Sequence, residues 1–211
     1  MARPSRNTDR LFIEAGKSLI PQTGFKGLRI RDVAKKAGVN LGMFNYHFKT
    51  RERFIEILLS EVYGEFLNSL EFGAHEGENC RDHLKNALTN IAVFVREHRS
   101  LIVPLVEELI SGNKGIMKFA KDHMSKHFFV LFDLINECKK KGYIAKDIPT
   151  LVAFISLVVP IVVPNVIARL GEKYYLKTLM GIFARPVFGL LLSDKMIQQR
   201  VSIGLKGVSE E

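Results

Sequence analysis

A segment near the N-terminus constrains the fold of this chain more than any other feature: residues 29–48, with the sequence RIRDVAKKAGVNLGMFNYHF. Its first half places Ile30, Val33 and Ala34 at three- and four-residue spacing, which predicts one buried face of a short helix. Gly38 follows, at a position where a left-handed backbone commonly ends a helix and where glycine is free of strain. The segment therefore predicts a short helix that ends in a tight turn.

A second short helix is predicted directly after this turn. Asn40 can cap it through its side-chain oxygen, and Phe44 and Phe48 restore the helical spacing of apolar residues. The outward-facing residues form a mixture that suits base edges and phosphates in a DNA major groove: Gly42, Met43, Asn45, Tyr46 and His47. Two short helices joined by a tight turn predict a helix-turn-helix motif at about residues 29–48.

The distribution of charge supports this interpretation independently. The first 53 residues contain twelve basic and four acidic residues, so they carry a net +8 of the chain's +9. Such a concentration of positive charge is typical of phosphate binding through counterion release, whereas solubility alone does not require it. A basic stretch without the helix pattern would more simply be a solvated surface. Together the two features predict double-stranded DNA as a partner.

The same region resembles the N-terminal DNA-binding domain of the tetracycline-repressor (TetR) family. The resemblance covers about residues 6–66 and differs from the usual pattern at Asn45, which stands where a phosphate-contacting tyrosine is common. Two caps differ as well: Leu28 and Arg29 precede the second helix, and Asn40 the third, where Ser or Thr is usual. The matching residues are Gly24, Phe25, Asp32, Val33, Ala34, Ala37, Gly38, Val39, Gly42, His47, Phe48, Thr50, Arg51, Glu52 and Phe54.

The resemblance implies a homodimeric, ligand-responsive repressor that binds a palindromic operator and is released by a small apolar or amphipathic effector. Residues from about 149 to 206 would supply the dimer interface, and the effector would shift the fourth helix and separate the two N-terminal domains. Base contacts are expected from Gly42, Met43 and Asn45, phosphate contacts from Arg29, Tyr46, His47, Lys49 and Arg51, and backbone or minor-groove contacts from an N-terminal arm with Arg3 and Arg6.

Helical periodicity continues along the chain and strand signals are scarce, so we predict an all-α fold. Thr8 is the expected cap of a first helix that ends at Pro21 and Gly24, and Thr50 is the expected cap of a long fourth helix. Further helices are expected at about residues 81–98, 101–111, 114–140, 149–170, 173–184 and 194–206. The predicted organisation is a three-helix helix-turn-helix domain at 6–66 and a larger helical ligand-binding and dimerisation domain at 67–211.

Residues 151–168 offer an alternative function, because they form an uncharged stretch of 18 residues that meets the minimal length of a membrane span. A membrane-anchored DNA- or ligand-binding protein would use this stretch as its single span. Pro160, Pro164 and Asn165 interrupt it and no second span is indicated, so a buried or intersubunit helix is favoured. With two widely separated cysteines and no secretory signal, we expect a cytoplasmic protein without a membrane partner.

Aromatic residues are plentiful between residues 90 and 190, and some of them could line an effector cavity. Aromatic residues at helical spacing usually pack in the core, so each one is a weak candidate by itself. The candidates are Phe94, Phe119, Phe128, Phe132, Phe154 and Phe183.

Other kinds of site are not indicated by the sequence. His123 and His127 have a spacing that can bind a metal when a third ligand joins, but their charged neighbours favour a solvated polar face. We find no glycine-rich phosphate loop, nucleophile elbow or carboxylate and histidine cluster. We therefore expect neither a metal, nor a cofactor, nor an enzyme.

Overall fold

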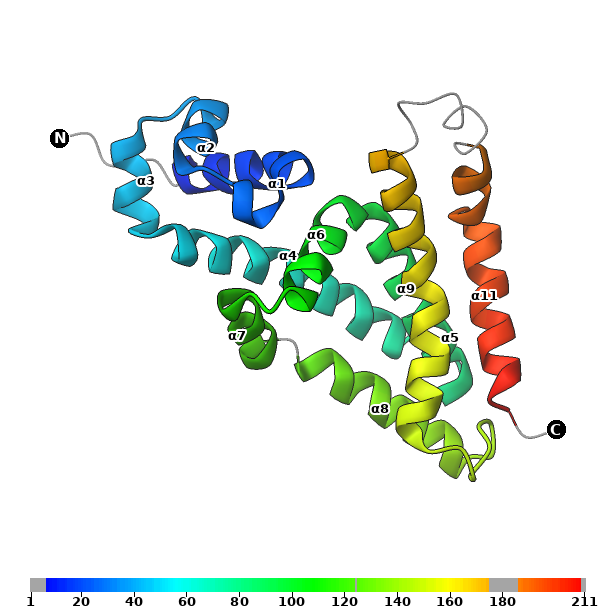
Figure 1. Ribbon diagram of the computed structural model, residues 1–211. Coiled ribbons are helices and arrows are strands. Elements are labelled where there is room, and N and C mark those ends of the chain that lie inside the picture. The colour runs from blue at the N-terminus through cyan, green and yellow to red at the C-terminus, as the bar shows by residue number, and fades with distance from the viewer. Residues whose placement is uncertain (1–6, 124, 175–185, 210–211) are drawn as a thin grey trace. The chain divides into compact units, whose positions relative to one another are not determined.

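The computed structural model describes residues 7–123, 125–174 and 186–209, and helices make up most of this part of the chain (Figure 1). No strand occurs among these residues, so the predicted all-α class is confirmed. The chain divides into two compact units. The first unit comprises Met1–Gly64 and Ser100–His123, and the second unit comprises Glu65–Arg99 and Met124–Glu211. Residues 100–123 thus group with the N-terminal helices, although the predicted functional boundary was near residue 66.

The first unit begins with four consecutive helices: α1 (Thr8–Gly27), α2 (Ile30–Ala37), α3 (Leu41–Phe48) and the first part of α4 (Arg51–Ala74). It also contains most of α6 (Arg99–Ile110) and all of α7 (Lys114–His123).

Two details at the ends of α1 differ from expectation, whereas the expected cap of α4 is present. Asn7 precedes α1 without a side-chain cap bond and Thr8 is the first helical residue, so Thr8 is not the cap. The helix continues through Pro21 and is interrupted at Gly24, whose φ of 66° lies in the region that favours glycine. The Thr50 hydroxyl accepts a hydrogen bond from the Arg53 N–H over 3.1 Å, which confirms Thr50 as the cap of α4.

Four phenylalanine rings from three helices form the core of the N-terminal part of the first unit. Phe12 of α1 packs against Phe44 and Phe48 of α3, and both of these pack against Phe54 of α4. The centroids of contacting rings lie between 4.9 and 5.8 Å apart, mostly in edge-to-face arrangements. All four rings are buried. This phenylalanine core holds α3 against α1 and α4.

The second unit contains the end of α4 together with α5 (Cys80–Glu97), α8 (Ser125–Lys140), α9 (Thr150–Tyr174) and α11 (Asp194–Gly207). Residues 186–191 are also helical. In this unit α5 packs against α8, α9 and α11, and α9 packs against α8 and α11 as well. The expected helix at 114–140 is described as α7 and α8, with residue 124 between them outside the described residues. Most of the expected helix at 173–184 also lies outside the described residues.

Ion pairs join the end of α5 and the start of α6 to α9 and α11. The Arg99 guanidinium lies 2.6 Å from a carboxylate oxygen of Glu172, whose other oxygen lies 3.4 Å from Arg169. Arg96 pairs with Asp194 over 2.6 Å. Because the Arg99 and Glu172 side chains are both largely covered, water screens their attraction less than that of a surface pair. These ion pairs fix the positions of α9 and α11 relative to the end of α5 and the start of α6.

Replacing Phe54 by alanine should destabilise the first unit, because it removes a ring from the centre of the phenylalanine core. The expected loss is about 3–5 kcal/mol in the free energy of unfolding, measured by urea titration followed by circular dichroism. Phe72→Ala is a matched control in the same helix, because the Phe72 side chain is 67% exposed, and it should change stability by no more than about 0.5 kcal/mol. Equal losses for the two variants would contradict the assignment of this core.

Candidate nucleic-acid interface

The turn between α2 and α3 has the backbone conformation that Gly38 predicts. Gly38 has φ 67° and ψ 26°, in the left-handed region, and follows the last residue of α2. The Gly38 N–H donates to the Lys35 carbonyl over 3.2 Å, and the Val39 N–H donates to the Ala34 carbonyl over 3.1 Å. These bonds satisfy carbonyl groups at the end of α2 and direct the chain into α3.

Helix α3 presents one face to the phenylalanine core and the opposite face outward. The Asn40 side-chain oxygen accepts from the Gly42 N–H over 2.7 Å, so the predicted cap is confirmed. Phe44 and Phe48 are buried against α1 and α4. The outward face carries the residues expected there: Gly42, Asn45 and Tyr46 are exposed, and Met43 and His47 are half-buried.

A concave depression of about 550 Å³ lies beside this outward face. Four residues that were predicted separately as DNA contacts line it together: Arg29, Asn45, Lys49 and Arg51. Arg31 lines it too and was not among the predicted contacts. Its position in the first turn of α2, two residues after Arg29, is the sequence signal that could have identified it. Polar and cationic side chains here converge on a surface that suits a nucleic-acid backbone.

Arg51 has a different position from the one predicted for a phosphate contact. Its Nε donates to the Leu28 carbonyl over 3.0 Å, and its Nη2 donates to the Phe25 carbonyl. Both carbonyls belong to the end of α1, where a positive charge is favoured. With these two bonds the guanidinium is engaged inside the protein, so Arg51 fastens α4 to α1. Arg51 also lines the depression beside α3, so its phosphate contact stays a prediction alongside this positioning role.

Tyr46 and His47 also differ in their freedom to reach a phosphate. The Tyr46 side chain is 65% exposed, as a phosphate contact requires. His47 is half-buried, with ring centroids 5.2 Å from Tyr46 and 6.0 Å from Phe48, and its Nε2 is buried without a hydrogen-bond partner. In this orientation Nε2 is covered, so His47 does not present that nitrogen to a phosphate.

Lys49, directly after α3, has a strained backbone. Its φ of 62° and ψ of −53° form a tight turn in which the Thr50 N–H donates to the Phe48 carbonyl over 2.6 Å. Lys49 is the one non-glycine residue with positive φ in the part of the chain that the structure describes. Such a conformation costs of order 1–3 kcal/mol, and strain of this kind is concentrated at functional sites. An exposed cation held in this turn supports a role for Lys49 in binding.

The candidate effector residues fall in different places. Phe94, Phe128, Phe132 and Phe154 belong to a continuous series of seven rings in the second unit, with neighbouring centroids between 4.0 and 5.5 Å apart. Phe119 lies in the first unit instead, next to Tyr63 and His123. Phe183, like Arg3 and Arg6 of the expected N-terminal arm, lies outside the described residues. In order, the ring series is His98, Phe94, Phe66, His127, Phe128, Phe154 and Phe132.

The ring series contains an imidazole that is neutral at physiological pH. Burial lowers the pKa of His127 to about 4, because the charged ring would lose its hydration. The ring series therefore lies in mostly apolar surroundings, and its two histidine rings are its polar members. An apolar or amphipathic molecule suits such surroundings better than a strongly charged one.

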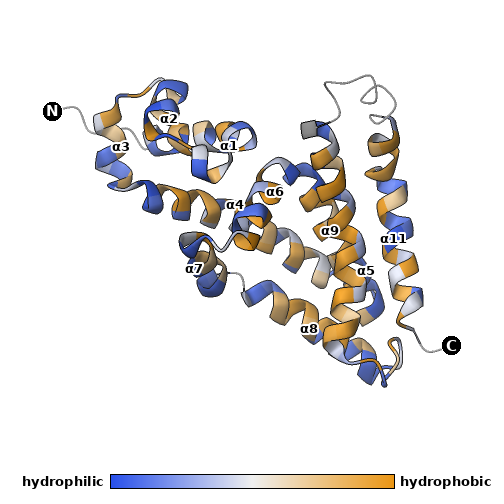
Figure 2. Ribbon diagram, in the orientation of Figure 1, coloured by the Kyte–Doolittle hydropathy of each residue, from blue (hydrophilic) through white to orange (hydrophobic). Residues whose placement is uncertain are grey.

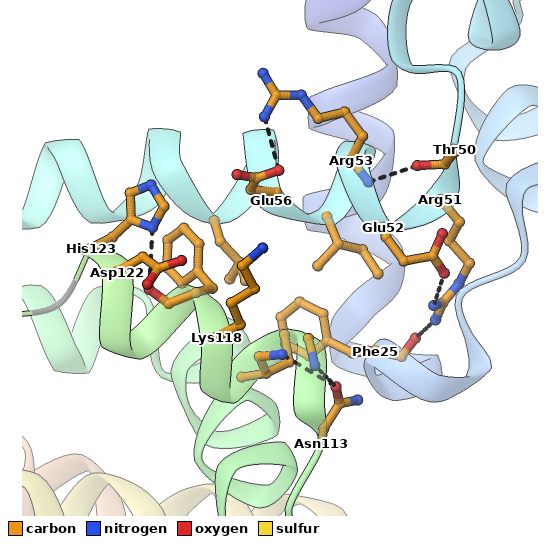
Figure 3. A pocket seen from close by; sticks show the side chains of 15 residues that line it. Phe25, Thr50, Arg51, Glu52, Arg53, Glu56, Asn113, Lys118, Asp122 and His123 are labelled. Carbon is orange, nitrogen blue, oxygen red and sulfur yellow. Dashed lines mark hydrogen bonds and ion pairs between the residues drawn. The ribbon is translucent and has the colours of Figure 1, made fainter.

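A second cleft, of about 570 Å³, lies within the first unit between the start of α4 and α7 (Figure 3). Phe25, Ile55 and Phe119 contribute apolar surface to it, and its charged side chains balance: Arg51, Arg53 and Lys118 against Glu52, Glu56 and Asp122. The hydrogen bond from Arg53 is the main cause that lowers the pKa of the Glu56 carboxyl, and the nearby charges of His123 and Lys118 act in the same direction. Balanced charge does not attract a polyanion, so this cleft is distinct from the depression beside α3.

Metal sites and membrane spans were sought in the same part of the chain. Among the described residues, no group of three histidine, cysteine or acidic side chains is placed to hold a metal ion. One helix there, residues 150–172 within α9, is long and apolar enough to cross a membrane by length and composition. Because α9 packs against α5, α8 and α11, a core helix of a soluble protein fits the same pattern.

The family model described as "Bacterial regulatory proteins, tetR family" matches residues 12–57, which span α1 to α3 and the start of α4. Residues 12–57 therefore form a TetR-type DNA-binding domain. The resemblance inferred from the sequence is thereby confirmed, and the chain is a DNA-binding transcriptional regulator with a helix-turn-helix motif.

Comparison with individual regulators shows similarity over most of the chain, beyond residues 12–57. The probable HTH-type transcriptional regulator YttP of Bacillus subtilis (strain 168) is 25% identical over 195 residues, 86% of this chain and 94% of that protein. A putative TetR-family regulator from Rhodococcus sp. superposes with a TM-score of 0.71 at 18% identity, over 96% of this chain and 98% of the other. FadR from Bacillus subtilis, solved in complex with stearoyl-CoA, superposes with a TM-score of 0.68 at 19% identity, over 88% and 98%. These relatives are named as regulators rather than as enzymes.

Replacing Lys49 by glycine should separate stability from DNA binding. Glycine adopts positive φ without strain, so we expect the free energy of unfolding to stay the same or to rise by about 1 kcal/mol. If the Lys49 ammonium contacts a phosphate, affinity for every duplex should fall, and the slope of log K against log salt should decrease by about one. Unfolding titrations and fluorescence anisotropy at several salt concentrations measure the two effects. A loss of both stability and affinity would argue against the strained turn.

Proposed function

We propose that the protein is a homodimeric, ligand-responsive repressor that places α3 of each subunit in the major groove of a palindromic operator. One observation carries this proposal: the outward face of α3 exposes Asn45 and Tyr46, while Arg29, Arg31 and Lys49 surround the depression beside it. A small polar face flanked by cations is the arrangement in which base edges are read and phosphates are held.

The proposed contacts divide into two groups. Gly42, Met43 and Asn45 lie nearest the bases and provide specificity. Arg29, Arg31, Tyr46 and Lys49 contact phosphates and provide affinity that does not depend on sequence. Asn45 is the side chain with the greatest power to discriminate, because an amide can form two hydrogen bonds with an adenine edge. Arg3 and Arg6 of the N-terminal arm are proposed to add backbone or minor-groove contacts.

An exposed apolar stripe on α9 supports the dimer. Leu151, Ile155, Val159, Val163 and Ile167 follow one another at four-residue spacing, and each is between 43% and 57% exposed. Figure 2 shows α9 as a mostly hydrophobic helix. A contiguous apolar stripe of this length is unfavourable in water, and a second copy of the same helix covers it by two-fold symmetry. We propose that residues 149–206 form this interface.

The packing of α9 against other helices of the second unit favours a soluble dimer over the membrane-anchored alternative. Asn165, near the middle of α9, is 1% exposed, and its Nδ2 donates to the Ile161 carbonyl. Packing of α9 against three other helices would be lost if the helix left the second unit to cross a bilayer. We accordingly place the protein in the cytoplasm.

An apolar or amphipathic effector is proposed for the second unit. Five of the seven rings in the series there are phenylalanines, and the similar FadR structure contains stearoyl-CoA, a molecule with a long apolar chain. An effector that prefers a spread arrangement of the two N-terminal domains by ~3 kcal/mol would weaken operator binding by roughly 100-fold. Because α4 continues from the first unit into the second, it is the helix through which this preference would act.

Replacing Asn45 by alanine should reduce discrimination between operator and random DNA. The operator is first recovered by selecting bound duplexes from a random-sequence library at near-physiological salt. Loss of one bidentate base contact should lower the ratio of specific to non-specific affinity by roughly 5- to 150-fold, or about 1–3 kcal/mol, with little change in non-specific binding. Anisotropy titrations with both duplexes measure this ratio.

Asn68→Ala, an exposed asparagine of α4 outside the interface, is the matched control and should leave the ratio unchanged. If Asn45→Ala weakened operator and random DNA alike, Asn45 would be a backbone contact. If no sequence were enriched from the library, the operator proposal itself would fail.

Replacing Val159 by aspartate should dissociate the dimer, because a charge in the middle of the apolar stripe would lose its hydration on association. Sedimentation velocity at micromolar concentration should then show monomers, whereas we expect the unmodified chain to sediment as a dimer. Phe129→Asp places the same charge at an apolar residue of α8 that is 65% exposed and lies outside 149–206. This control should remain dimeric. Dissociation by Phe129→Asp alone would move the interface to α8.

A further inference from the structure

The cleft between the start of α4 and α7 has an apolar floor and charged rims, and it lies wholly within the first unit (Figure 3). Ile55 and Leu59 of α4 and Ile116 and Phe119 of α7 provide apolar surface, and each is between 4% and 8% exposed. The volume of about 570 Å³ falls in the range of sites that bind small molecules. The cleft can therefore cover the apolar body of a small ligand.

The charged groups on the α4 side of the cleft already have partners inside the protein. Arg53 pairs with Glu56 over 2.8 Å. The Arg51 guanidinium donates to two backbone carbonyls at the end of α1, and one of its nitrogens lies 3.8 Å from a carboxylate oxygen of Glu52. A ligand that used these groups would have to compete with existing interactions.

Two opposite charges on the α7 side lack such partners among the described residues. Lys118 and Asp122 line the cleft four residues apart on one helix, both are exposed, and neither side chain forms an ion pair or a hydrogen bond in that part of the chain. In a helix an acidic residue pairs best with a base four residues later, and here the order is reversed. Lys118 and Asp122 therefore offer a cation and an anion on successive turns of α7.

His123 adds a hydrogen-bond acceptor at the same end of the cleft. Its Nδ1 lies 3.2 Å from the Phe119 carbonyl, which can only accept, so Nδ1 carries the proton. In the neutral ring Nε2 is then an acceptor. Asp122 and His123 together favour a ligand group that donates hydrogen bonds and carries positive charge.

We infer that this cleft binds a free α-amino acid with a large apolar side chain. The carboxylate of the amino acid accepts from the Lys118 ammonium, and its own ammonium donates to Asp122 and to Nε2 of His123. These two groups of an α-amino acid share one carbon atom, so they can bridge opposite charges on successive helical turns. The side chain then lies on the apolar floor. This site belongs to the first unit and is separate from the effector site proposed for the second unit.

Ligand-observed saturation-transfer NMR of the full-length chain with L-phenylalanine, without DNA, tests the site. We expect a dissociation constant of the order of 1 mM, as for other ligands of this size. L-Alanine has the same charged groups without a large side chain, L-phenylalanine amide lacks the carboxylate, and N-acetyl-L-phenylalanine lacks the ammonium. Each should bind at least about tenfold more weakly. Equal affinity for the four compounds, or no binding of L-phenylalanine up to about 20 mM, would overturn the site.

Substitutions on α7 show where the amino acid binds. Lys118→Gln and Asp122→Asn each remove one charge from an exposed side chain, so folding should be unchanged while affinity falls at least about tenfold. Lys121→Gln is the matched control, because Lys121 is an exposed lysine of the same helix that does not line the cleft, and it should bind like the unmodified chain. Unchanged affinity in Lys118→Gln or Asp122→Asn would overturn the assignment. Because no DNA is used, failure to recover an operator would leave this result unaffected.

Discussion

The DNA-binding surface depends on the packing of four phenylalanine rings, Phe12, Phe44, Phe48 and Phe54. Helix α3 has 8 residues, too few to be stable in water by itself, so its conformation depends on tertiary contacts. Two of the four rings belong to α3, and their burial against α1 and α4 determines which side of the helix faces outward. The orientation of Asn45 and Tyr46 toward solvent is a direct consequence, because they occupy the positions that the two rings leave free.

Two basic residues at the junction of α3 and α4 have different roles at the DNA-binding surface: one fixes the position of a helix and the other is exposed to solvent. Arg51 donates to the Leu28 and Phe25 carbonyls and joins the start of α4 to the end of α1. Lys49, two residues earlier, is exposed in a backbone turn that is unfavourable for any residue with a side chain. One cation therefore stabilises the unit while the other remains free for a polyanion. Both residues line the depression beside α3 and add positive charge to it, but only Arg51 also holds two helices together.

Features that depend on neighbouring residues in the chain were predictable, and several are confirmed. The turn at Gly38 and the caps at Asn40 and Thr50 follow from interactions within four residues. The helical spacing of Phe44 and Phe48 is also local, and it predicted which face of α3 is buried. The role of Arg51 was not predictable, because the carbonyls that engage it lie 23 and 26 residues earlier in the chain. For the same reason the aromatic content of the C-terminal region could not show that Phe119 lies in the first unit, apart from the ring series of the second unit.

The sequence by itself determined the all-α class, the helix-turn-helix motif and the concentration of positive charge that predicts DNA as a partner. Helical periodicity and capping are local properties of the backbone, and net charge is a property of composition, so neither requires knowledge of the fold. Only the tertiary structure decided which cations are free to bind, which aromatic rings lie together and where α4 changes from one unit to the other. Those outcomes depend on the carbonyl groups and rings that distant segments bring to each side chain, because a side chain already engaged inside the protein is not available to a ligand.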